Sequence, residues 1–285
     1  MADLVLRSGL RARTRARVPF RWSPETTVGA VTVAVVVVAA IIGPLISPWD
    51  PNKPDVLAAL EPPSLEHWMG TDSVGRDVLT RSLVGTQISL LAGVMITVAT
   101  VTIGTIIGAL VAYAGGWVDA FVSRVVDTAI AIPFIVVVLA TVAILGVGTL
   151  SVAVGMVVVG WAVYARIARA EVLSLREHEF IMATRSLGYS SPRILFRHVI
   201  PNVIRPGLTF ATMDVVAAMV VLAAMSYLGF GTQPPVADLG SIIASGQPFL
   251  LTAWWISTLP AFILIVLGVG VGMIDDGFSA RRKGR

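Results

Sequence analysis

The chain has 285 residues, of which 56% are hydrophobic and 13% are charged, whereas soluble domains carry about 25% charged residues. Water is therefore not the main solvent of this chain. Cysteine is absent, which excludes disulfide scaffolds, thiolate metal sites and cysteine nucleophiles. The three histidines are scattered along the sequence and predict no metal site.

The first predicted element is a helix over 27–46. Six arginines precede it, an arrangement also found in secretory signals. However, the apolar stretch is longer than a secretory core and runs into Ser47-Pro48-Trp49-Asp50, without a cleavage site of small residues. We therefore expect a helix that is retained and crosses the membrane.

The later uncharged runs approach twice the roughly 20 residues that a bilayer core requires. Between Thr128 and Ala165, glycines at 146 and 148 predict a turn that splits the run into two helices. The expected fold is an all-α integral membrane protein with six spans. Their predicted ranges are 27–46, 88–113, 125–145, 149–168, 206–228 and 253–274. Pro133 and Pro260 predict kinks in the third and sixth spans, and neither is assigned a solute contact.

The distribution of basic residues predicts the orientation. All lysines and arginines except Lys53, Arg76 and Arg81 lie in the two tails, in the 114–124 connection or in the 166–205 segment. Basic residues of short loops stay on the cytoplasmic side, so we expect both termini and that segment to be cytoplasmic. The net charge of +4 then calls for no nucleic-acid partner.

Two regions follow from this topology. Residues 1–80 comprise the tail, the first span and an acidic, proline-rich stretch from about residue 47, which we interpret as an extracytoplasmic linker. Residues 81–285 form a five-helix core with a cytoplasmic loop over about 169–205.

The cytoplasmic loop is longer and more patterned than a connection requires. Four residues at helical spacing predict a short helix with one distinct face: Phe180, Ala183, Thr184 and Leu187. Gly188 suits the C′ position of that helix. Ser191 and Pro192 then predict the N-cap and first turn of a second helix that runs toward Pro201. An amphipathic helix on the membrane surface is the alternative interpretation.

The same loop is similar to the cytoplasmic loop of permease subunits of bacterial ABC importers, which reads EAA, three residues, Gly, nine residues and I-x-L-P. The matching positions here are Met182-Ala183-Thr184, Gly188, His198, Ile200 and Pro201. The glycine and the final proline are kept, whereas Met182 stands where the family has glutamate.

A second stretch extends the resemblance. Residues 70–79 read GTDSVGRDVL, which resembles the G-T-D-x-x-G-R-D stretch of the C-type permeases for dipeptides and oligopeptides. Further matches include Tyr227-Leu228-Gly229 and Gln233-Pro234-Pro235. Together the matches cover roughly residues 30–280.

The resemblance implies a type I ABC importer permease in the bacterial cytoplasmic (inner) membrane. Such a subunit is non-catalytic and forms half of a translocation pathway in the lipid bilayer. The implied partners are a homologous B-type permease, two cytoplasmic ATPase domains that use ATP and Mg, and an extracytoplasmic solute-binding protein.

The family's ATPase-coupling helix corresponds to residues 177–190 of this chain. The residues assigned to coupling are Glu177, Glu179, Phe180, Met182, Ala183, Thr184, Arg185, Leu187, Gly188 and Pro201. The chain itself is expected to bind no cofactor, and Lys53 and Lys283 both lie outside any P-loop pattern. The energy must therefore come from another subunit.

Asp214 falls about two turns inside the fifth predicted span, and a carboxylate near the bilayer centre costs on the order of 3 kcal/mol. One hypothesis places it in the translocation pathway, where it meets the amino end of a peptide. The other pairs it with a loop arginine at the cytoplasmic margin. Relatives often have an acidic residue where this chain has Leu222, so no acidic role is carried over there. Asp127 is interpreted as structural.

Other functional classes compete with an importer permease. A membrane-embedded enzyme is disfavoured, because Asp214 is the only carboxylate that the apolar runs clearly bury and no histidine, cysteine or lysine accompanies it. A structural assembly factor would show no solute dependence. Within the importer hypothesis, di- or oligopeptides are the favoured solutes, with nickel or glutathione as alternatives.

Overall fold

The structure is a computed structural model that describes residues 23–176, 178, 182, 184 and 186–283. The regular elements of these residues are helices, apart from an isolated β-bridge between Thr71 and Asp77. In chain order they are α1 (Pro24–Ile46), η1 (Val56–Ala58), α2 (Val78–Ala114), α3 (Gly116–Ala131), α4 (Phe134–Leu145), α5 (Thr149–Arg176), α7 (Ser191–Ile194), η2 (Leu195–Val199), α8 (Ile200–Tyr227), α9 (Leu239–Gly246), η3 (Gln247–Phe249) and α10 (Trp255–Lys283).

The predicted all-α, multi-span fold is confirmed. Segments of α1, α2, α5, α8 and α10 are long and apolar enough to cross a membrane. The span predicted over 125–145 is not one continuous helix, because α3 and α4 form a pair bent by 89°. The bend falls at Pro133, whose ring fixes φ and removes a backbone N–H. Pro260, in contrast, lies inside α10, which continues to Lys283.

The spanning helices extend beyond their predicted ranges. α2 begins ten residues earlier than predicted, at Val78, and has 37 residues. At 1.5 Å per residue its length is about 55 Å, well beyond a hydrocarbon core of about 30 Å. α5 continues to Arg176 and α8 begins at Ile200. The sequence estimate was short because it counted only the residues that a bilayer core requires.

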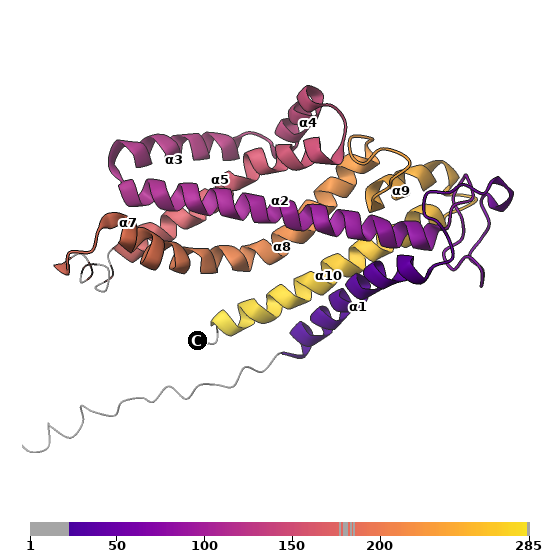
Figure 1. The fold of residues 1–285 in the computed structure, drawn as a ribbon, viewed down its shortest axis with the longest axis horizontal. Helices are drawn as coiled ribbons and strands as arrows, with labels where there is room; N and C mark the ends of the chain where they lie inside the picture. The colour runs from indigo at the N-terminus through magenta and orange to yellow at the C-terminus, as the bar shows by residue number, and fades with distance from the viewer. Residues whose placement is uncertain (1–22, 177, 179–181, 183, 185, 284–285) are drawn as a thin grey trace, which may run out of the picture.

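The core is a bundle of α2, α5 and α8, with α1 lying along α10 to one side of it (Figure 1). Glycines allow the backbones to approach. A Cβ atom at Gly108 on α2 would lie 2.3 Å from the carbonyl oxygen of Ala165 on α5, and one at Gly29 would lie 2.5 Å from that of Gly270. Small residues at such contacts permit the close packing that holds helices together in lipid.

Candidate functional site

Asp214 lies in the middle of α8, about four turns after its first residue, Ile200. The hydroxyl of Tyr164 on α5 donates a hydrogen bond of 2.5 Å to Asp214 Oδ2. Tyr164 is 2% exposed, whereas Asp214 is partly exposed. The described residues thus give this carboxylate a tyrosine partner from a neighbouring span, in place of the loop arginine of the structural hypothesis.

Asp214 borders a cavity of about 450 Å³. The wall of the cavity comes from α2, the break between α3 and α4, α5 and α8. Asp214 is the one charged residue among the described residues that line it. Pro133 borders the same cavity, although no pattern in the sequence connects the two residues.

The other acidic positions considered in the sequence lie elsewhere. Asp127 Oδ1 accepts a hydrogen bond of 2.7 Å from Arg166 Nη2, and both side chains are about half exposed. This pair joins α3 to α5, which fits a structural role. Leu222 is fully buried in an apolar cluster with Val138 and Val152, so its position offers no polar surroundings for an acidic group.

The predicted coupling loop follows α5. Met182, Thr184 and Ser186 are helical, and the N–H of Tyr189 donates to the carbonyl oxygen of Thr184 over 3.2 Å. Gly188 has a φ of +77°, a conformation that glycine adopts without the strain of a side chain, as its predicted C′ position requires. Leu187 is also described. Five other predicted coupling residues lie outside the described residues: Glu177, Glu179, Phe180, Ala183 and Arg185.

The second helix of the loop differs from the prediction. Its N-cap is Ser190 rather than Ser191, and the Ser190 side chain makes no capping bond. α7 has only four residues and continues through the π-helical turn η2 into α8. Pro201 is therefore the second residue of α8, directly after the π-helical turn, and does not end the helix.

One side of this loop is fixed to the bundle and the other is exposed. Ile194 and Val199 are fully buried in a cluster with small residues of α2 and α5, including Ala109 and Ala168. Leu187, in contrast, is 75% exposed. The described part of the loop is thus an attached extension of α8 that presents an apolar side chain outward.

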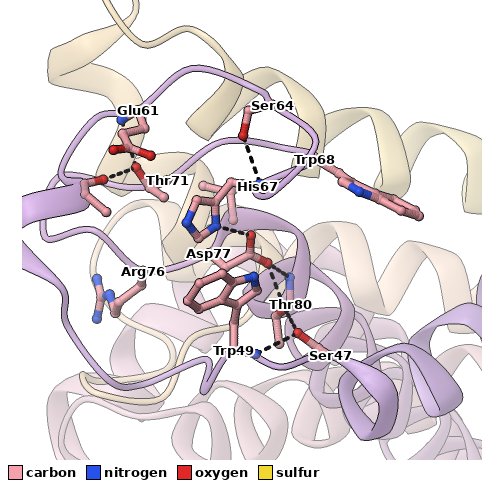
Figure 2. Close-up of polar contacts among 12 residues, drawn as sticks. Ser47, Trp49, Glu61, Ser64, His67, Trp68, Thr71, Arg76, Asp77 and Thr80 are labelled. Atoms are coloured by element: carbon pink, nitrogen blue, oxygen red, sulfur yellow. Dashed lines mark hydrogen bonds and ion pairs between the residues drawn. The ribbon is translucent and has the colours of Figure 1, made fainter.

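At the other end of the bundle, the segment between α1 and α2 is folded (Figure 2). Asp77 Oδ2 caps α2 by accepting hydrogen bonds of 2.7 Å from both the N–H and the hydroxyl of Thr80. Asp77 Oδ1 lies 2.9 Å from His67 Nδ1. The indole N–H of Trp255 on α10 donates to the carbonyl oxygen of Thr71. The segment predicted to be a linker is thus held by contacts around the start of α2, where the GTDSVGRD stretch supplies the N-cap residue Asp77.

Sequence reasoning missed the most deeply buried carboxylates. Asp238 is 0% exposed, Asp72 is 2% exposed and Asp77 is 4% exposed, so Asp214 is not the only buried carboxylate. Asp238 accepts a hydrogen bond from the Ser226 hydroxyl and forms a capping box with Ser241 at the start of α9. Aspartate followed three residues later by a hydroxyl residue, before an apolar run, is the signal that could have located this cap.

Two stretches of the chain match described families. Residues 104–284 match the family described as binding-protein-dependent transport system inner membrane component. Residues 20–63 match the N-terminal transmembrane domain of oligopeptide transport permease C. Together the two matches include α1, the coupling loop, α5, α8 and α10.

Named relatives agree with these families. The probable D,D-dipeptide transport system permease protein DdpC of Escherichia coli (strain K12) is 33% identical over 257 residues, which are 90% of this chain and 86% of the relative. The oligopeptide transport system permease protein OppC of Bacillus subtilis (strain 168) is 32% identical over 276 residues, which are 97% of this chain and 90% of the relative.

A solved structure supports the fold. A chain of the MetNI methionine ABC transporter, in an inward-facing conformation, matches with a TM-score of 0.50 and 20% identity over 67% of this chain and 92% of that chain. The chain therefore belongs to the binding-protein-dependent transport system inner membrane components, as a multi-pass permease of the peptide ABC transporter family.

Proposed function

We propose that this permease forms one half of the translocation pathway of an ATP-driven importer, which carries di- or oligopeptides across a bacterial cytoplasmic membrane. A homologous B-type permease forms the other half. Two cytoplasmic ATPase domains bind and hydrolyse ATP with Mg, and an extracytoplasmic binding protein delivers the peptide. The chain itself is non-catalytic. The peptide-permease names of relatives that match almost its whole length support this assignment.

The observation that carries the proposal is the helical connection between the coupling loop and the pathway. α7, η2 and α8 follow one another without a break, and α8 carries Asp214 at the cavity. Burial of Ile194 and Val199 holds the loop against α2 and α5. A push on residues 177–190 by a closing ATPase is therefore transmitted to the spans as a rigid-body movement.

In this proposal both termini and the coupling loop are cytoplasmic, and the folded segment before α2 is outside. Arg176 Nη1 donates to the carbonyl oxygen of Ala112 over 2.9 Å, so the end of α5 and the end of α2 meet at one end of the bundle. Basic residues gather at this end, as expected of a cytoplasmic face.

The coupling assignment is tested by Gly188→Trp in the complete complex reconstituted in proteoliposomes. Gly116→Trp is the matched control, because both glycines have positive φ, +77° and +63°, and a Cβ at either would meet no atom within 4 Å. We expect Gly188→Trp to abolish peptide-stimulated ATP hydrolysis and uptake, and Gly116→Trp to retain both. Normal stimulated transport in Gly188→Trp would contradict the assignment.

A further inference from the structure

We infer that the cavity beside Asp214 binds a cationic group, and that this group is the amino-terminal ammonium of the peptide in transit. The inference rests on the proposed transport function and adds to it a specific site, made by Asp214, Thr97 and the end of α3. Each contributes an oxygen or a negative partial charge to an otherwise apolar cavity.

The carboxylate of Asp214 is only partly compensated. Tyr164 donates to Oδ2, and no other described side chain donates to this aspartate. A carboxylate at membrane depth is costly unless it is paired, and a hydrogen bond from a neutral hydroxyl leaves its charge without a counterion. Because no described cation lines the cavity, an ammonium that enters it supplies the missing partner.

The break between α3 and α4 adds to the negative potential. α3 ends at Ala131, and residues 130–134 border the cavity. The last carbonyl groups of a helix lack intrahelical donors and carry the negative end of the helix dipole. Pro133 has no N–H to offer them. Carbonyl ends of broken membrane helices serve as cation ligands in transporters, and this carbonyl end adjoins the same cavity as Asp214.

Thr97 adds a buried hydroxyl without a described partner at the wall of the cavity. The residue is 4% exposed. A hydroxyl oxygen accepts hydrogen bonds from an ammonium group. The cavity volume of about 450 Å³ is far above the ~30 Å³ of one water molecule, so there is room for the first residue of a peptide behind its ammonium.

The test compares uptake of trialanine and N-acetyl-trialanine by the complete complex in proteoliposomes, at concentrations that load the binding protein equally. Acetylation removes the positive charge and leaves the rest of the peptide. We expect Asp214→Asn to slow trialanine uptake by about tenfold or more, and Thr97→Val to slow it severalfold. Uptake of the acetylated peptide should be unchanged in both variants.

Thr97→Val preserves side-chain shape and removes a hydroxyl that has no described partner, so it keeps the test decisive if Asp214→Asn fails to assemble. Asp127→Asn is the control, because Asp127 pairs with Arg166 away from the cavity, and it should affect neither peptide. Equal slowing of both peptides would overturn the inference and leave Asp214 a purely structural group.

Two further outcomes separate the possible failures. If wild-type uptake requires Na⁺ and Asp214→Asn loses that requirement, the site holds an inorganic cation and the peptide assignment is overturned. If the wild-type complex transports peptides but both variants match it, the inference fails while the proposed function stands. If the wild-type complex transports neither peptide, the proposed function fails and the inference fails with it.

Discussion

Tyr164 on α5 and Asp214 on α8 join two spanning helices through a hydrogen bond of 2.5 Å from the tyrosine hydroxyl to Asp214 Oδ2. The tyrosine ring is almost fully buried, whereas the aspartate borders the cavity. The same contact therefore stabilises the bundle and orients the one charge of the described cavity wall.

Replacing Tyr164 by phenylalanine removes this donor and leaves the ring in place. We expect a loss of about 1–3 kcal/mol in stability, because the aspartate loses its described hydrogen-bond donor. The loss should appear as a lower thermal unfolding midpoint of the purified complex. Tyr189→Phe removes the hydroxyl of an exposed tyrosine in the coupling loop and should leave the midpoint unchanged. Equal shifts of the unfolding midpoint in the two variants would show that the hydrogen bond between Tyr164 and Asp214 does not stabilise the bundle.

The contact between α2 and α5 depends on Gly108. Gly108→Ala places a Cβ about where the backbone of Ala165 already lies, and overpacking of this kind costs about 1–3 kcal/mol. We expect a lower unfolding midpoint and less monodisperse complex on size-exclusion chromatography. Gly272→Ala is the control, since a Cβ there meets no atom within 4 Å. A tolerated Gly108→Ala would contradict the close packing of α2 and α5.

Apolar runs predicted the spans because each must bury about 20 residues in lipid, and the turn at 146–148 was confirmed, with Gly146 at a φ of +90°. Helix ends were poorly predicted. Arg81 lies in the first turn of α2, where its guanidinium donates to the carbonyl oxygen of Pro51 in the folded segment. Only tertiary contacts provide that partner, so the sequence alone placed the start of α2 too late.

The cavity beside Asp214 could be predicted only in part. The charge of Asp214 in an apolar run marks it, but its neighbours Tyr164, Thr97 and Pro133 come from other helices, and no spacing in the sequence brings them together. The sharpness of the bend between α3 and α4 was also unpredictable, because a membrane helix accommodates proline either by a bend or, as at Pro260 in α10, within a continuous helix. Nothing in the structure explains Met182 at the position of the family's glutamate.

The folded segment before α2 depends on the cap made by Asp77. Asp77→Ala removes the N-cap, a loss of about 0.5–2 kcal/mol, and leaves buried His67 without its carboxylate partner. We expect faster cleavage of this segment by added protease in right-side-out vesicles, which expose it. Glu66→Ala, at an exposed position in the same segment, should not change the rate. Similar cleavage rates for both variants would contradict the capping role.

The exposed side chain of Leu187 should contribute to ATPase binding. Leu187→Asp places a charge on a residue that is 75% exposed, so it should leave the bundle intact and reduce co-purification of the ATPase subunits by about tenfold. Leu251→Asp makes the same change at a fully exposed leucine at the opposite end of the bundle, and should retain the ATPases. Undiminished co-purification with Leu187→Asp would argue against docking at this loop.

The most direct test of the central claim measures ATP hydrolysis and labelled peptide uptake together, in proteoliposomes that contain both permeases and the ATPases, with the binding protein added. We predict that a peptide-loaded binding protein raises ATP hydrolysis severalfold and drives uptake, and that vesicles assembled without this chain do neither. Peptide-driven hydrolysis and uptake that persist without this chain, or a complete complex that never responds to peptide, would contradict its assignment as half of a peptide translocation pathway.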